Sequence, residues 1–148
     1  AYDIRLSLVG SEMCIRDSAL LPHRPGGATL KQLLVGANAG ASNPHPLSQA
    51  SDLSAYGSEA AAVEALPGAE RQLAGGLTEA MVRFAVRHEY ARTVEDVLAR
   101  RVRLLFLDAR LAGSLAAAVG AIVAEETGCD PEIAAFEALA AKYLHLPA

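Results

Sequence analysis

Six charged residues between positions 87 and 103 form the one group of side chains in this sequence whose types and spacing suggest polar chemistry. They are Arg87, Glu89, Asp96, Arg100, Arg101 and Arg103. The planar guanidinium group of arginine can pair with a carboxylate through two parallel hydrogen bonds. We therefore interpret the group as an ion-pair cluster that joins two helices, or that joins this domain to another. The alternative is an anion site, in which the arginines contact an anionic substrate or the phosphate groups of a membrane.

The other reactive side chains form no catalytic or metal-binding pattern, so we assign no catalytic, cofactor-binding or metal-binding residue. His88 has no serine or cysteine nearby that it could activate, and we expect a buried core histidine there. The remaining histidines lack the spacing of metal ligands, and they are His23, His45 and His145. Cys129 is followed by an aspartate, whose charge disfavours a thiolate, so we expect an unreactive thiol.

The elements that must position these residues are predicted to be helices. Ala, Leu, Glu and Arg dominate the chain after position 47, and all four favour helix. We expect short helices over residues 47–56 and 58–66, the second capped by Ser58, followed by a loop over residues 67–76. Thr78 should cap the next helix. The buried face of that helix shows helical spacing at Met81, Phe84, Ala85 and His88.

The second half of the chain carries further start and stop signals. Thr93–Asp96 is a variant of the capping box, which starts a helix. Leu104–Leu107 is apolar on every side, so we expect it at the centre of the core. Asp108 should begin a long helix that ends at Gly128, and Asp130 should cap the last helix. The buried stripe of this last helix is expected at Ile133, Phe136, Ala140 and Tyr143.

These signals predict an all-α fold, a small bundle of about five or six helices over residues 47–146 with an irregular N-terminal lead-in. Residues 19–46 are rich in Pro, Gly, Asn and Ser, as is typical of a linker or lead-in. Residues 8–18, LVGSEMCIRDS, match the translation of a common transposase-based sequencing adapter. We therefore interpret residues 1–18 as adapter-derived and expect no fixed structure in them.

Charge and hydropathy argue against nucleic acid as a partner and against a transmembrane segment. The formal net charge is −4, whereas a surface that binds nucleic acid needs an excess of Lys and Arg. The sequence has no apolar run of about 18 residues, so we predict no transmembrane segment. The oligomeric state cannot be read from the sequence.

Residues 84–108, FAVRHEYARTVEDVLARRVRLLFLD, carry a specific pattern. The segment resembles the C-terminal domain of FAD-dependent glycerol-3-phosphate dehydrogenases and of the related alpha-glycerophosphate oxidases. The residues in register with that family are Arg87, Glu89, Ala91, Thr93, Asp96, Leu98, Arg100, Arg101, Arg103, Leu104 and Leu107. Two positions depart from it, because Val102 stands where Thr is common and Met81 where an acid is common.

The resemblance implies a complete protein that is a peripheral membrane flavoenzyme. Such an enzyme oxidises sn-glycerol 3-phosphate to dihydroxyacetone phosphate at FAD and passes electrons to a quinone, or to oxygen in the oxidases. The flavin domain of such an enzyme carries a G-x-G-x-x-G turn, which this chain lacks. We therefore expect a non-catalytic C-terminal fragment that holds no cofactor and whose partner is the flavin domain of the same polypeptide.

Two further expectations concern its location and an alternative role. The implied location is cytoplasmic or peripheral to the membrane in a bacterium, and mitochondrial in a eukaryote. The alternative role is that of a free-standing helical module for protein interaction, unrelated to glycerol metabolism.

Overall fold

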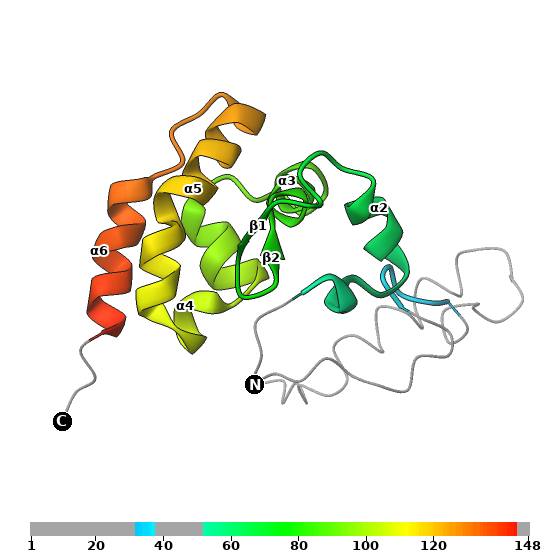
Figure 1. The fold of residues 1–148 in the computed structure, drawn as a ribbon, viewed down its shortest axis with the longest axis horizontal. Coiled ribbons are helices and arrows are strands. Elements are labelled where there is room, and N and C mark those ends of the chain that lie inside the picture. The colour runs from blue at the N-terminus through cyan, green and yellow to red at the C-terminus, as the bar shows by residue number, and fades with distance from the viewer. Residues whose placement is uncertain (1–31, 38–51, 145–148) are drawn as a thin grey trace, which may run out of the picture. The chain divides into compact units, whose positions relative to one another are not determined.

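The structure, a computed structural model, describes residues 32–37 and 52–144 (Figure 1). The predictions for residues 1–18, for most of the lead-in over 19–46 and for residues 47–51 fall outside this part of the chain. The described chain is mainly helical, which confirms the predicted all-α class with one small exception.

The exception is a β-hairpin near the start of the helical region. Before it lie the 3₁₀-helix η2 (Leu53–Glu59) and the short helix α2 (Ala60–Glu64). The hairpin pairs β1 (Gln72–Ala74) with β2 (Leu77–Thr78) in antiparallel fashion. The elements that follow are α3 (Glu79–His88), the π-helix η3 (Asp96–Arg101), α4 (Leu104–Leu107), α5 (Ala109–Thr127) and α6 (Ile133–Tyr143).

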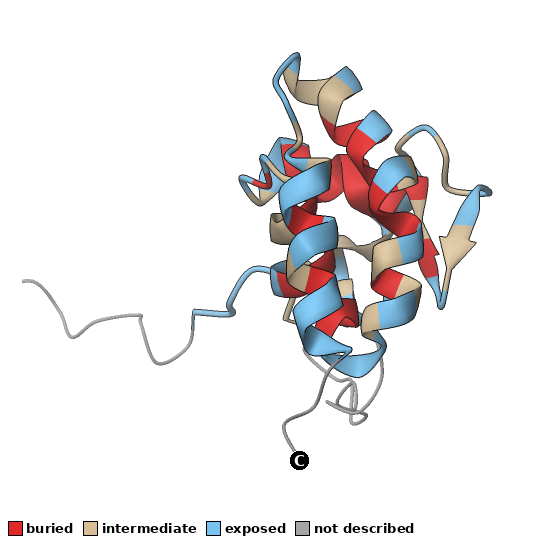
Figure 2. Cartoon of the chain, turned by 90° about the vertical axis from the view of Figure 1, so that its left-hand side faces the viewer, coloured by how far each residue is buried: buried red, intermediate tan, exposed pale blue. Residues whose placement is uncertain are grey.

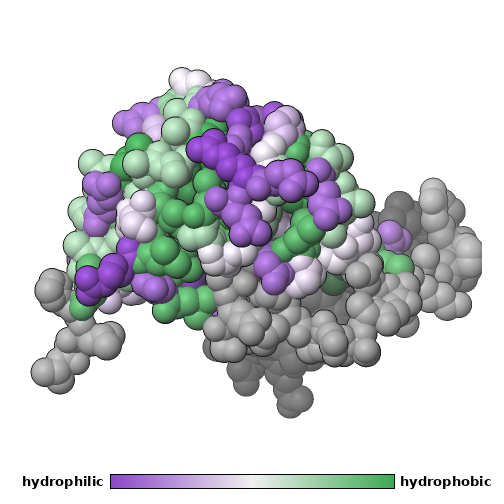
Figure 3. Space-filling model, in the orientation of Figure 1, coloured by the Kyte–Doolittle hydropathy of each residue, from purple (hydrophilic) through white to green (hydrophobic). Residues whose placement is uncertain are grey.

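Helix α5 is the central element, because α3, α4 and α6 all pack against it. Its buried residues include Leu115, Val119 and Val123, and small residues at Ala112 and Ala116 let the neighbouring helices approach closely. Figure 2 shows the buried residues along the inward sides of the helices and the exposed ones outside. Hydrophilic surface covers the face around α3 and the hairpin, and apolar surface lies toward α4 and α5 (Figure 3). None of the described helices has the length and apolar character needed to cross a membrane.

Four predicted helix boundaries are confirmed, because each is made by a short-range hydrogen bond or a local backbone preference. Thr78 caps α3 by accepting the N–H three residues on, at 3.3 Å. Thr93 and Asp96 exchange backbone-to-side-chain hydrogen bonds of 3.1 and 3.2 Å, as a capping box requires. Asp108 caps α5 at 2.9 Å, and Gly128 ends it in the left-handed conformation with φ 68°.

Two predictions in the first half of the domain are wrong. Ser58 does not cap a helix, because α2 begins at Ala60 and no side chain of the described residues bonds the N–H groups of its first turn. The predicted loop over residues 67–76 contains β1. Strands of two and three residues are too short to show the alternation of apolar and polar residues that predicts a strand. The turn signal was present, because Gly75 and Gly76 both have positive φ, as the turn of a Gly-Gly hairpin requires.

Three predictions in the second half are also corrected. Leu104 and Leu105 are buried, but Phe106 is 56% exposed and Leu107 39%, because the neighbouring elements cover α4 only in part. Asp130 does not cap α6. Its carboxylate accepts from the N–H of Glu132, whose φ of 58° postpones the helix to Ile133. Tyr143 lies beyond the buried stripe of α6 and is 46% exposed.

The two glycines of α5 test how closely α6 packs. A Cβ at Gly120 would lie 2.5 Å from Cγ1 of Ile133, whereas a Cβ at Gly113 would make only an ordinary contact of 3.7 Å with Ala140. We expect Gly113→Ala to stabilise the chain by about 0.5–1 kcal/mol, because alanine favours helix. Gly120→Ala should be destabilising by about 1 kcal/mol or more, because overpacking outweighs the same gain. Thermal unfolding of both variants measures the difference, and equal melting temperatures would contradict this packing.

Candidate functional site

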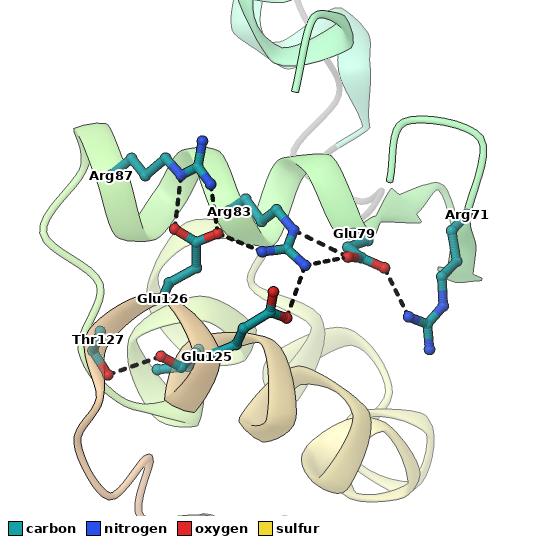
Figure 4. A network of polar contacts seen from close by, with 8 residues as sticks. Arg71, Glu79, Arg83, Arg87, Glu125, Glu126 and Thr127 are labelled. Carbon is teal, nitrogen blue, oxygen red and sulfur yellow. Dashed lines mark hydrogen bonds and ion pairs between the residues drawn. The ribbon is translucent and has the colours of Figure 1, made fainter. Parts of the chain in front are cut away.

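The largest polar feature of the described residues is an ion-pair network between α3 and α5, centred on Arg83 (Figure 4). Glu79, Arg83 and Arg87 follow one another at a spacing of four residues, which places them along one side of α3. Glu125 and Glu126 reach them from the last turn of α5. The network therefore joins two helices whose contributing residues are more than 35 positions apart in the chain.

Arg83 is almost fully buried, with 9% of its side chain exposed, and three carboxylates surround its guanidinium group. Its Nε and Nη2 atoms donate to Oε1 of Glu79 at 3.0 and 2.6 Å. Nη2 also pairs with Glu125 at 2.9 Å, and Nη1 pairs with Glu126. Such complete pairing is what a buried cation requires, because an unpaired charge in the interior is costly.

Two outer arginines complete the balance of charge. Arg87 holds Glu126 through two hydrogen bonds of 2.7 Å each, the paired geometry in which guanidinium and carboxylate fit best. Arg71, which precedes β1, pairs with the second oxygen of Glu79 at 2.8 Å. Three guanidinium groups thus face three carboxylates, and the carboxylates of Glu79 and Glu126 are each bonded to two of them.

The electrostatics of the network favour the charged forms of Glu79, Arg83 and Glu126. Hydrogen bonds from Arg87 and then Arg83 lower the pKa of Glu126 to about 2. The Arg83 guanidinium lowers the pKa of Glu79, and the surrounding carboxylates raise the pKa of Arg83 further above its ordinary range. Groups shifted in these directions do not exchange protons near neutral pH. The network is therefore suited to holding helices together and not to acid–base catalysis.

The structure places four of the six residues of the predicted cluster in two separate pairs. Arg100 pairs with Asp96 at 2.9 Å, and also with Glu95. Arg101 lies 3.5 Å from Glu89. The other two residues of the six are not brought into these pairs.

Arg87 joins the Arg83 network instead, and Arg103 has no ion pair among the described residues. Whether the six residues contact another domain remains a prediction.

The backbone around this cluster has an unusual geometry. η3 is a π-helix, and the N–H of Val102 donates to the carbonyl of Val97, five residues back, at 3.0 Å. Arg103, immediately after it, has a left-handed φ of 59°. Burial opposes ionisation of Asp96, but hydrogen bonds from the N–H groups of Arg92 and Thr93 hold its pKa below the usual value. π-Helical turns occur frequently at functional sites, so this segment is a candidate for contact with a partner.

The other candidate residues lie outside these clusters. His88 is exposed and not buried as predicted, because it sits at the last position of α3, where its ring stacks on Phe84 with 4.7 Å between ring centres. Cys129 is a free, exposed thiol in the connection between α5 and α6. Within the described ranges no three His, Cys, Asp or Glu side chains are grouped as metal ligands would be.

Sequence reasoning missed most of the Arg83 network. The missed residues are Arg71, Glu79, Arg83, Glu125 and Glu126. A signal for two of them was present, since Glu79 and Arg83 recur with Arg87 at helical spacing next to the apolar face of α3. The acidic partners on α5 could not be paired with them from sequence, because only the packing of α3 on α5 brings them within reach.

Removing the central cation tests the network. We expect Arg83→Met to reduce the free energy of unfolding by about 3 kcal/mol, because Glu79 and Glu126 would keep their burial and lose a partner. The matched control is Arg100→Met, whose pairs with Glu95 and Asp96 are exposed and should contribute less than about 1 kcal/mol. Urea denaturation measures both, and similar losses for the two variants would contradict a buried network.

The depressed pKa of Glu126 predicts a dependence of stability on pH. The ordinary pKa of this carboxyl is 4.5, and its pKa in the folded chain is about 2. As the pH falls, Glu126 is therefore protonated in the unfolded chain before it is protonated in the folded chain. The stabilisation is therefore complete above about pH 4.5 and is lost as the pH falls toward 2. Glu126→Gln should flatten the fall of unfolding free energy in this range. The control is Glu137→Gln, at an exposed site on α6, which should not change the slope of unfolding free energy against pH. If Glu126→Gln also left this slope unchanged, the role given to Glu126 would be refuted.

Comparisons with known proteins agree with the family suggested by residues 84–108. Residues 26–134 match the family model described as the C-terminal domain of alpha-glycerophosphate oxidase. A stretch of 53 residues is 47% identical to the mitochondrial glycerol-3-phosphate dehydrogenase of Schizosaccharomyces pombe, which covers 36% of this chain and 8% of that protein. No solved structure matches the chain. Because the family match spans more than half of its length, this chain belongs to the family of C-terminal domains of alpha-glycerophosphate oxidase.

Proposed function

We propose that this chain is the non-catalytic C-terminal helical domain of an FAD-dependent glycerol-3-phosphate dehydrogenase. The complete polypeptide would oxidise sn-glycerol 3-phosphate to dihydroxyacetone phosphate and pass electrons to a quinone. The observation that carries the proposal is the family match over residues 26–134, supported by the identity with the yeast mitochondrial dehydrogenase. The chain spans only a small part of that relative's length, so the chemistry belongs to the remainder of the polypeptide.

The described residues do not fit the FAD that this reaction needs. A dinucleotide site of the usual type requires a parallel strand followed by a glycine-rich turn at a helix N-terminus. The described residues contain one antiparallel hairpin, whose turn at Gly75–Gly76 leads into a second strand and not into a helix. We therefore assign the cofactor to a preceding flavin domain and derive no catalytic step for this chain.

The role that remains for this domain is to support the flavin domain. In the Arg83 network the buried charged side chains of α3 and α5 pair with one another. This pairing favours a rigid supporting role for the domain over a catalytic role. The relative from Schizosaccharomyces pombe is named as mitochondrial, and we propose the same location for this chain if its source is a eukaryote. For a bacterial source we propose a cytoplasmic or membrane-peripheral location. Association of the complete enzyme with a membrane would then be peripheral.

The experiment that tests the proposal uses the complete polypeptide encoded by the source gene. Purified from cells, it should show flavin absorbance that bleaches when sn-glycerol 3-phosphate is added without an electron acceptor. The 148-residue chain, purified alongside as a control, should neither bind FAD nor reduce a dye acceptor. A complete polypeptide without flavin, or one that sn-glycerol 3-phosphate leaves oxidised, would contradict the proposal.

The second candidate function is a free-standing helical interaction module. The observations that favour this alternative are the π-helical backbone of η3 and the exposed ring of Tyr90 near it. A source gene that encodes no dinucleotide-binding domain would support the module and exclude the dehydrogenase.

A further inference from the structure

A small cleft lies between η2 and η3, on the side where the chain enters the described domain. Its volume is about 190 Å³, and its lining residues are Ala55, Tyr56, Glu89, Arg100 and Arg101. Burial raises the pKa of the Tyr56 hydroxyl, and the nearby Glu89 carboxylate raises it further. The cleft is separate from the Arg83 network, with which it shares no residue.

Glu89 contributes an acceptor that the described residues do not satisfy. Its Oε2 atom is buried and accepts no hydrogen bond among them. The Nε atom of Arg101 lies 3.5 Å away, close enough for an ion pair but too far for a hydrogen bond. Burial raises the pKa of Glu89, in keeping with this incomplete pairing. A buried acceptor without a donor destabilises the folded state, so the cleft favours a ligand or partner that supplies one.

Tyr90, the next residue, is held in a strained conformation with its ring in solvent. Its φ is 59°, in the left-handed region, and 82% of the residue is exposed. Both neighbours fix it, since Arg101 donates to the carbonyl of Glu89 and the N–H of Ala91 donates to the carbonyl of Ala85 at 3.0 Å. A bulky residue in this region is uncommon, and strain of this kind concentrates at binding sites. Tyrosine is also among the residues that dominate binding energy at protein interfaces.

The position of the cleft indicates what would occupy it. The incoming chain is fixed to η2, because the N–H of Ser58 donates to the carbonyl of Gly36 and a Cβ at Gly57 would lie 1.9 Å from that oxygen. η2 also supplies Ala55 and Tyr56 to the cleft wall. A C-terminal domain is preceded by the rest of its protein, and most of the yeast relative lies outside the matched region. A domain that precedes this one would therefore be attached through a segment that packs on η2, an element of the cleft wall.

A rival surface exists at the exposed apolar residues of α4 and of the end of α6. These residues are Phe106, Leu107, Tyr143 and Leu144. Two of them already pack against each other, because the rings of Phe106 and Tyr143 lie edge to face with 5.6 Å between their centres. Among the described residues, this patch contains no buried polar atom without a hydrogen bond. The observations therefore favour the cleft.

We propose that the cleft of Tyr56, Glu89 and Arg101, with Tyr90 at its rim, is the surface on which the preceding flavin domain of the same polypeptide docks. That domain would present a hydrogen-bond donor, from a lysine, an arginine or a backbone N–H, to Glu89 and would cover the ring of Tyr90. The proposal rests on the proposed function and specifies its partner and contact. It also gives the strain at Tyr90 a role, since the docked domain compensates for it.

Tyr90→Gly tests the docking because its effect should change sign between two contexts. In the 148-residue chain the substitution relieves the left-handed strain and should raise the melting temperature by about 3 °C. In the complete polypeptide it removes an interface anchor, and the helical domain should unfold at a lower temperature than in the wild type. Calorimetric scans of both proteins measure this.

Glu132→Gly is the matched control. Glu132 has the same strain, with φ 58°, is exposed, and does not line the cleft, so its substitution should be stabilising in both contexts. Amide hydrogen exchange gives a second measurement. Residues 85–91 should exchange more slowly in the complete polypeptide than in the 148-residue chain, and Tyr90→Gly should abolish that difference.

Three outcomes would overturn the docking proposal. Tyr90→Gly could raise the melting temperature equally in both contexts, or Tyr143→Ala could release the helical domain while Tyr90→Gly does not. The third is a wild-type 148-residue chain that forms a dimer which Tyr90→Gly dissociates, because the occupant would then be a second copy. Each differs from failure of the proposed function, in which the complete polypeptide carries no flavin at all.

Discussion

The pairing of the buried Arg83 guanidinium with carboxylates from two helices is the constraint on which this domain depends. A cation with 9% of its side chain exposed is tolerated only if fixed partners replace its hydration. Those partners come from α3 itself and from the last turn of α5, so the two helices can pack in only one register. Because α5 also carries the contacts to α4 and α6, the register set at Arg83 extends to the rest of the core.

The segment that follows α3 combines two left-handed non-glycine residues with a π-helix. Tyr90 and Arg103 both have left-handed φ values, and the π-helix η3 lies between them. The capping box of Thr93 and Asp96 and the hydrogen bond of Arg101 to the Glu89 carbonyl hold this geometry in place. The charged residues of this segment therefore lie on a backbone that the helical core keeps from relaxing, which suits a fixed contact surface better than a mobile one.

The described residues divide their polar groups between these two regions in different ways. Around Arg83 every buried charge has a partner, so that region is complete within the chain. Around Glu89 one buried oxygen has no hydrogen bond, and the neighbouring tyrosine ring is exposed. This contrast separates the part of the domain that stabilises its own fold from the part that is arranged for a partner. Neither region combines a nucleophile with a base.

The sequence by itself determined the family, the helical class and the helix boundaries whose hydrogen bonds span three or four residues. Thr78, the Thr93–Asp96 box, Asp108 and Gly128 could be read correctly because each acts within one turn of chain. Only the tertiary structure decided the two partners of Arg83 on α5, which lie 42 and 43 residues away, and the exposure of Phe106, which its neighbours cover only in part. Local patterns record bonds between near neighbours, whereas ion pairs and burial depend on which distant helices pack together.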